Sequence, residues 1–161
     1  MIAASSSVIG WRVWILRNNR LESIAQPGSW HPGENRAACR LQTCAAVPGP
    51  GCHCGFWALH DPVAAMHIAA QVKKGGVRRT VAVGLIQGFG SVALHGEEGF
   101  RAGAATVMCI FADLPDRIDY SHLRARVAER YGVPCVSLQA AMSIGLLSEF
   151  GVDCARVAEL S

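Results

Sequence analysis

Four of the seven cysteines lie close together in the sequence, as Cys39, Cys44, Cys52 and Cys54. Tetrahedral zinc sites take their four ligands from thiolates and imidazoles, usually as two close pairs of residues. Gly55 follows the second pair directly, and glycine permits the positive φ with which a chain turns its amide groups back toward sulfur. The sequence therefore predicts a metal site at these four cysteines, with zinc as the favoured metal.

The predicted metal is structural rather than catalytic. Four protein ligands would close the coordination shell, whereas a catalytic zinc keeps one position open for water. The nearest acidic residue in sequence is Glu34, which has no evident placement as a general base. A metal would also explain how residues 25–60, which are rich in proline and glycine, could hold one shape.

The spacing of the second pair leaves alternatives open. One residue separates Cys52 from Cys54, whereas paired zinc ligands are commonly two to four residues apart. His31, His53 or His60 could therefore replace a cysteine as ligand. The cysteines could instead be small buried apolar side chains. Cys52 and Cys54 could also act as a redox pair, because a disulfide between them would be strained and easily reduced.

The remaining cysteines, the first residues and the lack of a long apolar run together predict a reducing compartment. Cys109, Cys135 and Cys154 lie in apolar stretches and are expected in the core. The first residues, MIAASSSVIGW, lack a basic region followed by a long apolar one, and no run of about 18 apolar residues occurs. We therefore expect a cytoplasmic protein without a membrane span, in which clustered cysteines bind metal rather than form disulfides.

Local signals outline the elements that would position the site. Residues 8–17 alternate like a strand, and Asn18-Asn19 form a turn to a partner strand at residues 20–24. Asp61 is expected to cap a helix that ends at Gly75 in the left-handed conformation. Residues 80–96 and 100–113 are rich in valine and small residues and predict two or three antiparallel strands.

The last third of the chain is expected to be helical. Ser121 would cap a helix that ends at Gly132, and Ser137 would cap a second helix over residues 138–150. Asp153 would cap a final helical turn.

These elements define an α+β fold. We expect an N-terminal hairpin and a cysteine-rich metal-stapled segment packed on a small antiparallel sheet with three or four helices. A single domain would span residues 1–161. It would comprise the hairpin and cysteine-rich segment at 8–60, a helix and antiparallel strands at 61–112, and a helical part at 113–161.

Four tryptophans, Trp11, Trp14, Trp30 and Trp57, all precede the long helix. Large aromatic side chains in a small domain mainly pack, so we expect them to join the metal segment to the hairpin. The alternative is an aromatic-lined ligand pocket.

Two polar groups also have a functional alternative. His95, Glu97, Glu98 and Arg101 are expected at a solvent-facing hairpin tip, although such a set could do acid–base chemistry. Lys73, Lys74, Arg78 and Arg79 suit a helix end better than a phosphate site, since the formal net charge is only +3. No phosphate-binding glycine motif is present.

Several motifs together resemble a set of uncharacterised bacterial proteins. The motifs are GWRVW, SWHPGENRAAC, CHCGFWAL and GSVALHGEEGFRAG, in that order over residues 8–105. The resemblance implies no activity. By this resemblance, seven residues belong to the shared motifs: Trp11, Trp30, Cys39, Cys52, Cys54, Gly55 and Arg101. Cys44 stands where such proteins often have histidine, an exchange that zinc ligation tolerates.

The function that these observations favour is a non-catalytic binding or adaptor module stabilised by structural zinc. Its partner would be a protein or a small molecule, at the aromatic N-terminal region and the loop at residues 95–101. The alternative is a thiol or metal redox enzyme or sensor that uses Cys52 and Cys54. Nucleic acid ranks last as a partner.

Overall fold

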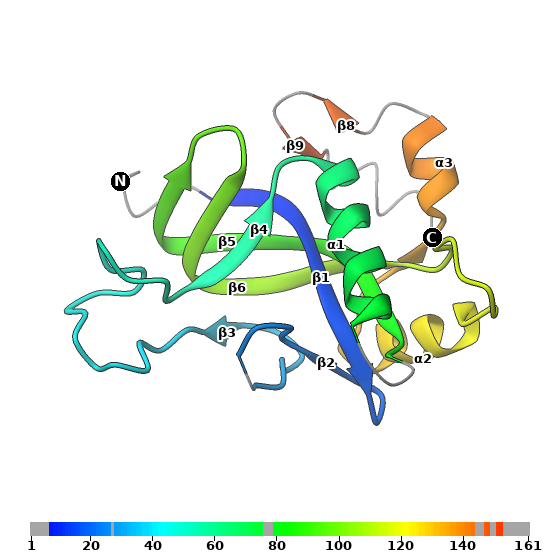
Figure 1. Cartoon of the computed structure of the whole chain (residues 1–161), viewed down its shortest axis with the longest axis horizontal. Coiled ribbons are helices and arrows are strands. Elements are labelled where there is room, and N and C mark those ends of the chain that lie inside the picture. Colours follow the sequence, from blue (N-terminus) through cyan, green and yellow to red (C-terminus); the bar gives the residue numbers. More distant parts are fainter. Residues whose placement is uncertain (1–6, 27, 76–78, 144–146, 149–150, 153–161) are drawn as a thin grey trace.

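A computed structural model describes residues 7–26, 28–75, 79–143, 147–148 and 151–152. A seven-stranded sheet forms its centre (Figure 1). Alternate residues along a strand face opposite sides of a sheet. Accordingly, Val81 and Val83 contribute to one core cluster with helix α1 (Pro62–Lys74), and Ala82 contributes to another with helix α2 (Ser121–Tyr131). Helix α3 (Leu138–Ser143) adds Leu138 and Ala141 to the α1 cluster, so the sheet has helices on both faces.

The predicted N-terminal hairpin is confirmed. Strand β1 (Val8–Arg17) pairs in antiparallel register with β2 (Arg20–Glu22). Asn18 and Asn19 join them with φ values of 51° and 57°. Two consecutive residues with positive φ match the right-handed twist of the strands they join, and asparagine adopts this conformation more readily than most residues.

Two long strands form the centre of the sheet. Strand β5 (Val81–His95) pairs antiparallel with β6 (Gly99–Phe111), with register shifts at Leu85/Ile86 and Phe89/Val92. The predicted antiparallel pair is therefore confirmed. The α+β class is confirmed, but the sheet is mixed rather than the predicted small antiparallel one, because the short strand β7 (Cys135–Val136) pairs parallel with β6 after the α2 crossover.

Strand pairing closes on itself at one end of the sheet. Strand β4 (Phe56–Leu59) pairs along its length with β6 and meets β1 at one position, where Trp11 faces Leu59. Since β1 also pairs with β5, the order β1-β5-β6-β4 returns to β1 like a small barrel. Phe100 fills this end: a Cβ at Gly10 or Gly88 would lie 2.8 or 2.5 Å from its ring. Strand β3 (Asn35–Arg36) adds a further short pairing to β6.

The sequence signals for helix ends predict where the two longer helices begin and end, but two of the predicted caps differ in the structure. Asp61 caps α1 as predicted, since its Oδ1 accepts a hydrogen bond from Val63 N at 2.9 Å. Gly75 ends α1 with a φ of −77°, so the predicted left-handed stop there is wrong. Ser121 is the first residue of α2 rather than its cap. Gly132 ends α2 as predicted, and it does so in the left-handed conformation, with a φ of 65°.

The C-terminal part is less helical than predicted. Ser137 caps α3 (Leu138–Ser143) as expected, because its Oγ accepts a hydrogen bond from Ala140 N at 3.1 Å. The helix does not extend over 138–150, since β8 (Leu147–Ser148) and β9 (Gly151–Val152) form an antiparallel pair. The predicted turn after Asp153 lies outside the described residues.

The described residues hold three helices, which fits the predicted three or four. None of these helices is long and apolar enough to cross a membrane.

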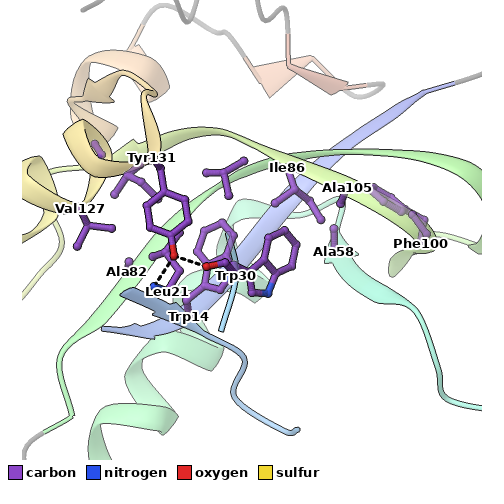
Figure 2. Packing of buried hydrophobic residues seen from close by; sticks show 14 of the residues in the cluster. Trp14, Leu21, Trp30, Ala58, Ala82, Ile86, Phe100, Ala105, Val127 and Tyr131 are labelled. Atoms are coloured by element: carbon purple, nitrogen blue, oxygen red, sulfur yellow. Dashed lines mark hydrogen bonds between the residues drawn. The ribbon is translucent and has the colours of Figure 1, made fainter. Parts of the chain in front are cut away.

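A buried tyrosine joins the hairpin to α2. The Tyr131 hydroxyl donates a hydrogen bond to Trp30 O at 2.6 Å and accepts one from Leu21 N at 3.1 Å (Figure 2). Trp14 and Trp30 pack edge to face beside it, with ring centroids 5.6 Å apart. Removing the hydroxyl would leave two buried backbone groups without a partner.

We therefore predict that Tyr131→Phe lowers the free energy of unfolding by about 1–3 kcal/mol, the usual cost of an unsatisfied buried polar group. Urea unfolding followed by tryptophan fluorescence measures the change. Tyr120→Phe is the control, since Tyr120 lies outside this network and should change stability by less than about 0.5 kcal/mol. Equal stability of the two variants would show that the Tyr131 bonds contribute nothing net.

Candidate metal centre

The four predicted cysteines come together. The Sγ atoms of Cys39, Cys44, Cys52 and Cys54 all lie within 4.8 Å of one another and could hold a metal ion. The Cys39–Cys52 and Cys44–Cys54 Sγ distances are 3.8 and 3.7 Å. A regular tetrahedron with metal–sulfur bonds of about 2.3 Å has edges of about 3.8 Å. The two distances therefore match the edges of a four-thiolate site.

The chain between β3 and β4 reaches this arrangement through turns rather than regular elements (Figure 1). Gln42 has a φ of 53°, and its N–H donates to Cys39 O at 3.1 Å, so the chain reverses between the first two cysteines. Gly55 has a φ of 107°, which fits the reversal expected after the second pair.

Gly49 is a contact that the sequence did not single out. Its N–H donates to Cys54 Sγ at 3.3 Å, as amides do in thiolate metal sites. A Cβ at this residue would lie only 2.3 Å from Cys44 Sγ. Glycine is therefore needed here for space, and the surrounding Pro48 and Pro50 were the only hint of it in the sequence.

Close sulfur contacts link the two sequence pairs. Cys52 contacts Cys39, and Cys54 contacts Cys44. One intervening residue thus suffices for Cys52 and Cys54 to reach the same group of sulfurs. All four are free thiols. His31, His53 and His60 do not belong to this group, and no other such group occurs in the described part of the chain.

The thiols of this cluster affect one another's ionisation. A hydrogen bond from the Thr43 backbone is the main cause that lowers the pKa of Cys39 to about 6. A hydrogen bond with Cys39 is the main cause that raises the pKa of Cys44 to about 12. One thiolate is thus favoured and a second opposed. A bound cation is what stabilises several thiolates at such short distances.

Arg101 fastens the second cysteine pair to the sheet. It lies on β6 and is 6% exposed. Its Nη1 donates to Cys54 O at 2.9 Å and also to Cys52 O, and its Nε donates to His95 Nε2 at 2.8 Å. These contacts do not favour the alternative acid–base role of His95, Glu97, Glu98 and Arg101, because Arg101 is committed to backbone carbonyls.

Trp57 packs against both His95 and Arg101. Its ring stacks on His95 with centroids 4.7 Å apart, and the Arg101 Cζ lies 5.2 Å from its centroid. Its Nε1 donates a hydrogen bond at 3.3 Å to the carbonyl oxygen of His53, the residue between Cys52 and Cys54. Trp57 is 37% exposed, while the other three tryptophans are buried.

The remaining predicted candidates lie elsewhere. Lys73 pairs with Asp116, which also pairs with the buried Arg124, so this cation takes part in the fold. Arg78 lies outside the described residues. Cys109 is buried in the core as expected, and Cys135 is half-buried. Cys154 lies outside the described residues.

Comparison of the chain with models of protein families, with curated proteins and with solved structures finds no match.

We predict that Gly49→Ala weakens metal binding by about tenfold or more, the usual scale for disturbing groups that orient metal ligands. The added methyl would displace Cys44 Sγ. Competition with a chromophoric chelator measures the affinity. Gly28→Ala is the matched control, because a Cβ there meets no atom within 4 Å. Identical affinities for the two variants would contradict the proposed crowding.

We also predict that Arg101→Gln lowers metal affinity by about tenfold to a hundredfold, because the Cys52 and Cys54 carbonyls lose their donor. The same chelator competition measures this loss. The exposed Arg36, on the neighbouring strand β3, supplies the control variant Arg36→Gln. A loss of stability without any loss of metal affinity would show that Arg101 serves the sheet alone.

Proposed function

We propose that this protein is a non-catalytic binding module whose four-cysteine site holds a structural zinc ion. The observation that carries the proposal is the convergence of four sulfur atoms, all within 4.8 Å, from a segment with no regular structure. Four thiolates supply a complete tetrahedral shell. A closed shell leaves no position for a substrate or a water nucleophile.

The setting of the cluster supports a structural role. Most side chains of residues 37–55 are exposed or half-exposed, so the segment has little apolar core of its own. Such a segment pays a large conformational entropy cost to become ordered. Metal coordination can supply the missing stabilisation, since binding free energy at a site formed only on folding becomes folding free energy.

Zinc is favoured over iron on chemical grounds. Four-thiolate tetrahedral sites take either metal, and zinc brings no redox chemistry. The redox alternative requires Cys52 and Cys54 to react with each other. The short sulfur contacts run instead to Cys39 and Cys44, which favours shared coordination.

We predict about one tightly bound zinc per chain in the purified protein. Cys52→Ser should release it and lower the melting temperature by roughly 6–12 °C, as a loss of about 3 kcal/mol does in a domain of this size. Elemental analysis and thermal unfolding followed by circular dichroism measure the two quantities. Cys135→Ser is the matched control, since Cys135 is half-buried and lies outside the cluster.

A protein that purifies without metal and melts unchanged after Cys52→Ser would overturn the proposal. Bound iron, seen by its visible absorption, would overturn the choice of zinc. A metal-free, folded protein that forms a Cys52–Cys54 disulfide under mild oxidation would support the redox alternative instead.

A further inference from the structure

A pocket of about 730 Å³ lies beside the cysteine cluster. Four aromatic residues line it, Trp11, Trp30, Phe56 and Trp57. Its volume falls in the range of about 300–1,000 Å³ that is usual for small-molecule sites. A pocket lined by Trp11, Trp30 and Trp57 is therefore present, as in the alternative role for the tryptophans, whereas Trp14 does not line it and is buried in the core.

The pocket exists because one edge of β1 is interrupted. On its other edge, β1 pairs with β5 continuously from Val8 to Ile15. On the pocket side it pairs with β4 only at Trp11 and with β2 only from Ile15 onward. Residues 12–14 therefore have no strand partner on this edge in the described part of the chain. The hollow occupies the place where a strand would otherwise lie.

Arg12 brings a positive charge to this gap. Its Nη1 donates to Trp57 O on β4 at 2.5 Å, and its Nη2 donates to Ser23 Oγ at 3.1 Å. Its Cζ lies 4.8 Å from the centre of the Trp30 ring. These contacts hold the guanidinium against the aromatic wall in one orientation.

No anion balances this charge within the described residues. None of their carboxylates forms an ion pair with Arg12, and its buried Nε has no hydrogen-bond partner. Burial lowers the pKa of Arg12 to about 10, so the group is still charged near neutral pH but poorly solvated. The two hydrogen-bond acceptors of Arg12, Trp57 O and Ser23 Oγ, are neutral, and a carboxylate is the partner that a guanidinium binds best.

The other charged residues that line the pocket also favour an anionic ligand. Arg36 and Arg40 lie at the pocket, and the only carboxylate that lines it, Glu34, pairs with Arg36 at 2.5 Å. Of the charged residues that line the pocket, three are cationic and one is anionic, so the lining has a net positive charge.

The aromatic wall is rigid as well as apolar. Trp30 packs against Trp14 and against Phe56, with centroids 5.6 and 4.6 Å away, and its Nε1 donates to Ser23 Oγ at 3.1 Å. Trp11 stacks on Phe111 at 5.0 Å. Fixed aromatic rings favour a flat apolar ligand that can stack or meet them edge to face.

We propose that this pocket binds a small organic carboxylate with a planar apolar body, whose carboxylate is held by Arg12. The inference rests on the binding function proposed above and names the class of ligand. His53 and Gly55, from the metal-binding loop, also line the pocket. The metal site therefore fixes part of the wall.

The test uses the metal-loaded full chain and three probes. These are 2-naphthoate, its neutral analogue 2-naphthamide, and the non-aromatic cyclohexanecarboxylate. We expect 2-naphthoate to bind in calorimetry and the other two to bind at least about tenfold more weakly, since each lacks one of the two recognised features. No binding of 2-naphthoate to the folded protein at millimolar concentration would overturn the proposal.

Arg12→Gln should weaken 2-naphthoate binding about tenfold or more, because a hydrogen bond to a charged group is lost. Arg17→Gln is the matched control: Arg17 lies on the same strand, is exposed and pairs with Glu22, and should leave the affinity unchanged. Equal affinity of a folded Arg12→Gln variant and the wild type would overturn the assignment of the carboxylate to Arg12.

Nuclear magnetic resonance of the wild type gives an independent result if Arg12→Gln does not fold. On addition of 2-naphthoate, the Arg12 Nε–H and the Trp30 and Trp57 indole N–H signals should shift. Shifts confined to surface residues away from the pocket would overturn the proposal. The metal content of each sample separates the zinc hypothesis from the pocket hypothesis. A zinc-free, folded protein that binds 2-naphthoate would refute the zinc site and leave the carboxylate pocket standing.

Discussion

The bond between Arg101 and the carbonyls of Cys52 and Cys54 is the contact on which the rest of the site depends. The sulfur atoms hold the cysteine-rich segment to itself, but they do not fix its position on the sheet. A buried guanidinium on β6 contributes to that position, beside the pairing of β3 and β4 with the same strand, because it binds the backbone of the segment. A planar group with five donors suits this task better than an ammonium group would.

The same anchoring connects the metal centre to the pocket. Strand β4 begins just after the second cysteine pair and pairs with β6 beside Arg101. Trp57 on β4 then contacts Arg101 on one side, and its carbonyl accepts a hydrogen bond from Arg12. Two arginines that are far apart in sequence thus hold the same short strand. Metal binding and ligand binding would share this strand, although neither chemistry requires the other.

The sequence was most informative where the signal is local. The Asn18-Asn19 turn, the Asp61 cap and the Gly132 stop each depend on backbone preferences of one or two residues, and each is confirmed. The clustering of four cysteines was also foreseeable, because ligand chemistry restricts how such residues are used. Helix length after Ser137 was not foreseeable, since the pairing of β8 with β9 competes with helical propensity there.

Long-range contacts were not readable from the chain. Arg101 was expected at a solvent-facing tip, and its burial follows from the length of β6 and the arrival of the cysteine-rich loop. Arg12 alternates with Trp11 and Val13 as a solvent-facing residue of a hairpin would, but Trp57 O on β4 and the Trp30 ring contact its guanidinium. The need for glycine at position 49 depends on how close its backbone lies to Cys44 Sγ, and no spacing rule gives that distance.

The interrupted edge of β1 also bears on strand addition by another chain. An exposed strand edge is a template on which another chain can add a strand, and proteins commonly shield such edges with bulges, charges or covering segments. Here the unpaired stretch is only residues 12–14, bounded by β2 at one end and β4 at the other. A foreign strand would find too few free backbone groups in register and would meet the Arg12 charge. The gap that creates the pocket thus leaves the sheet without an edge long enough to seed aggregation at this point.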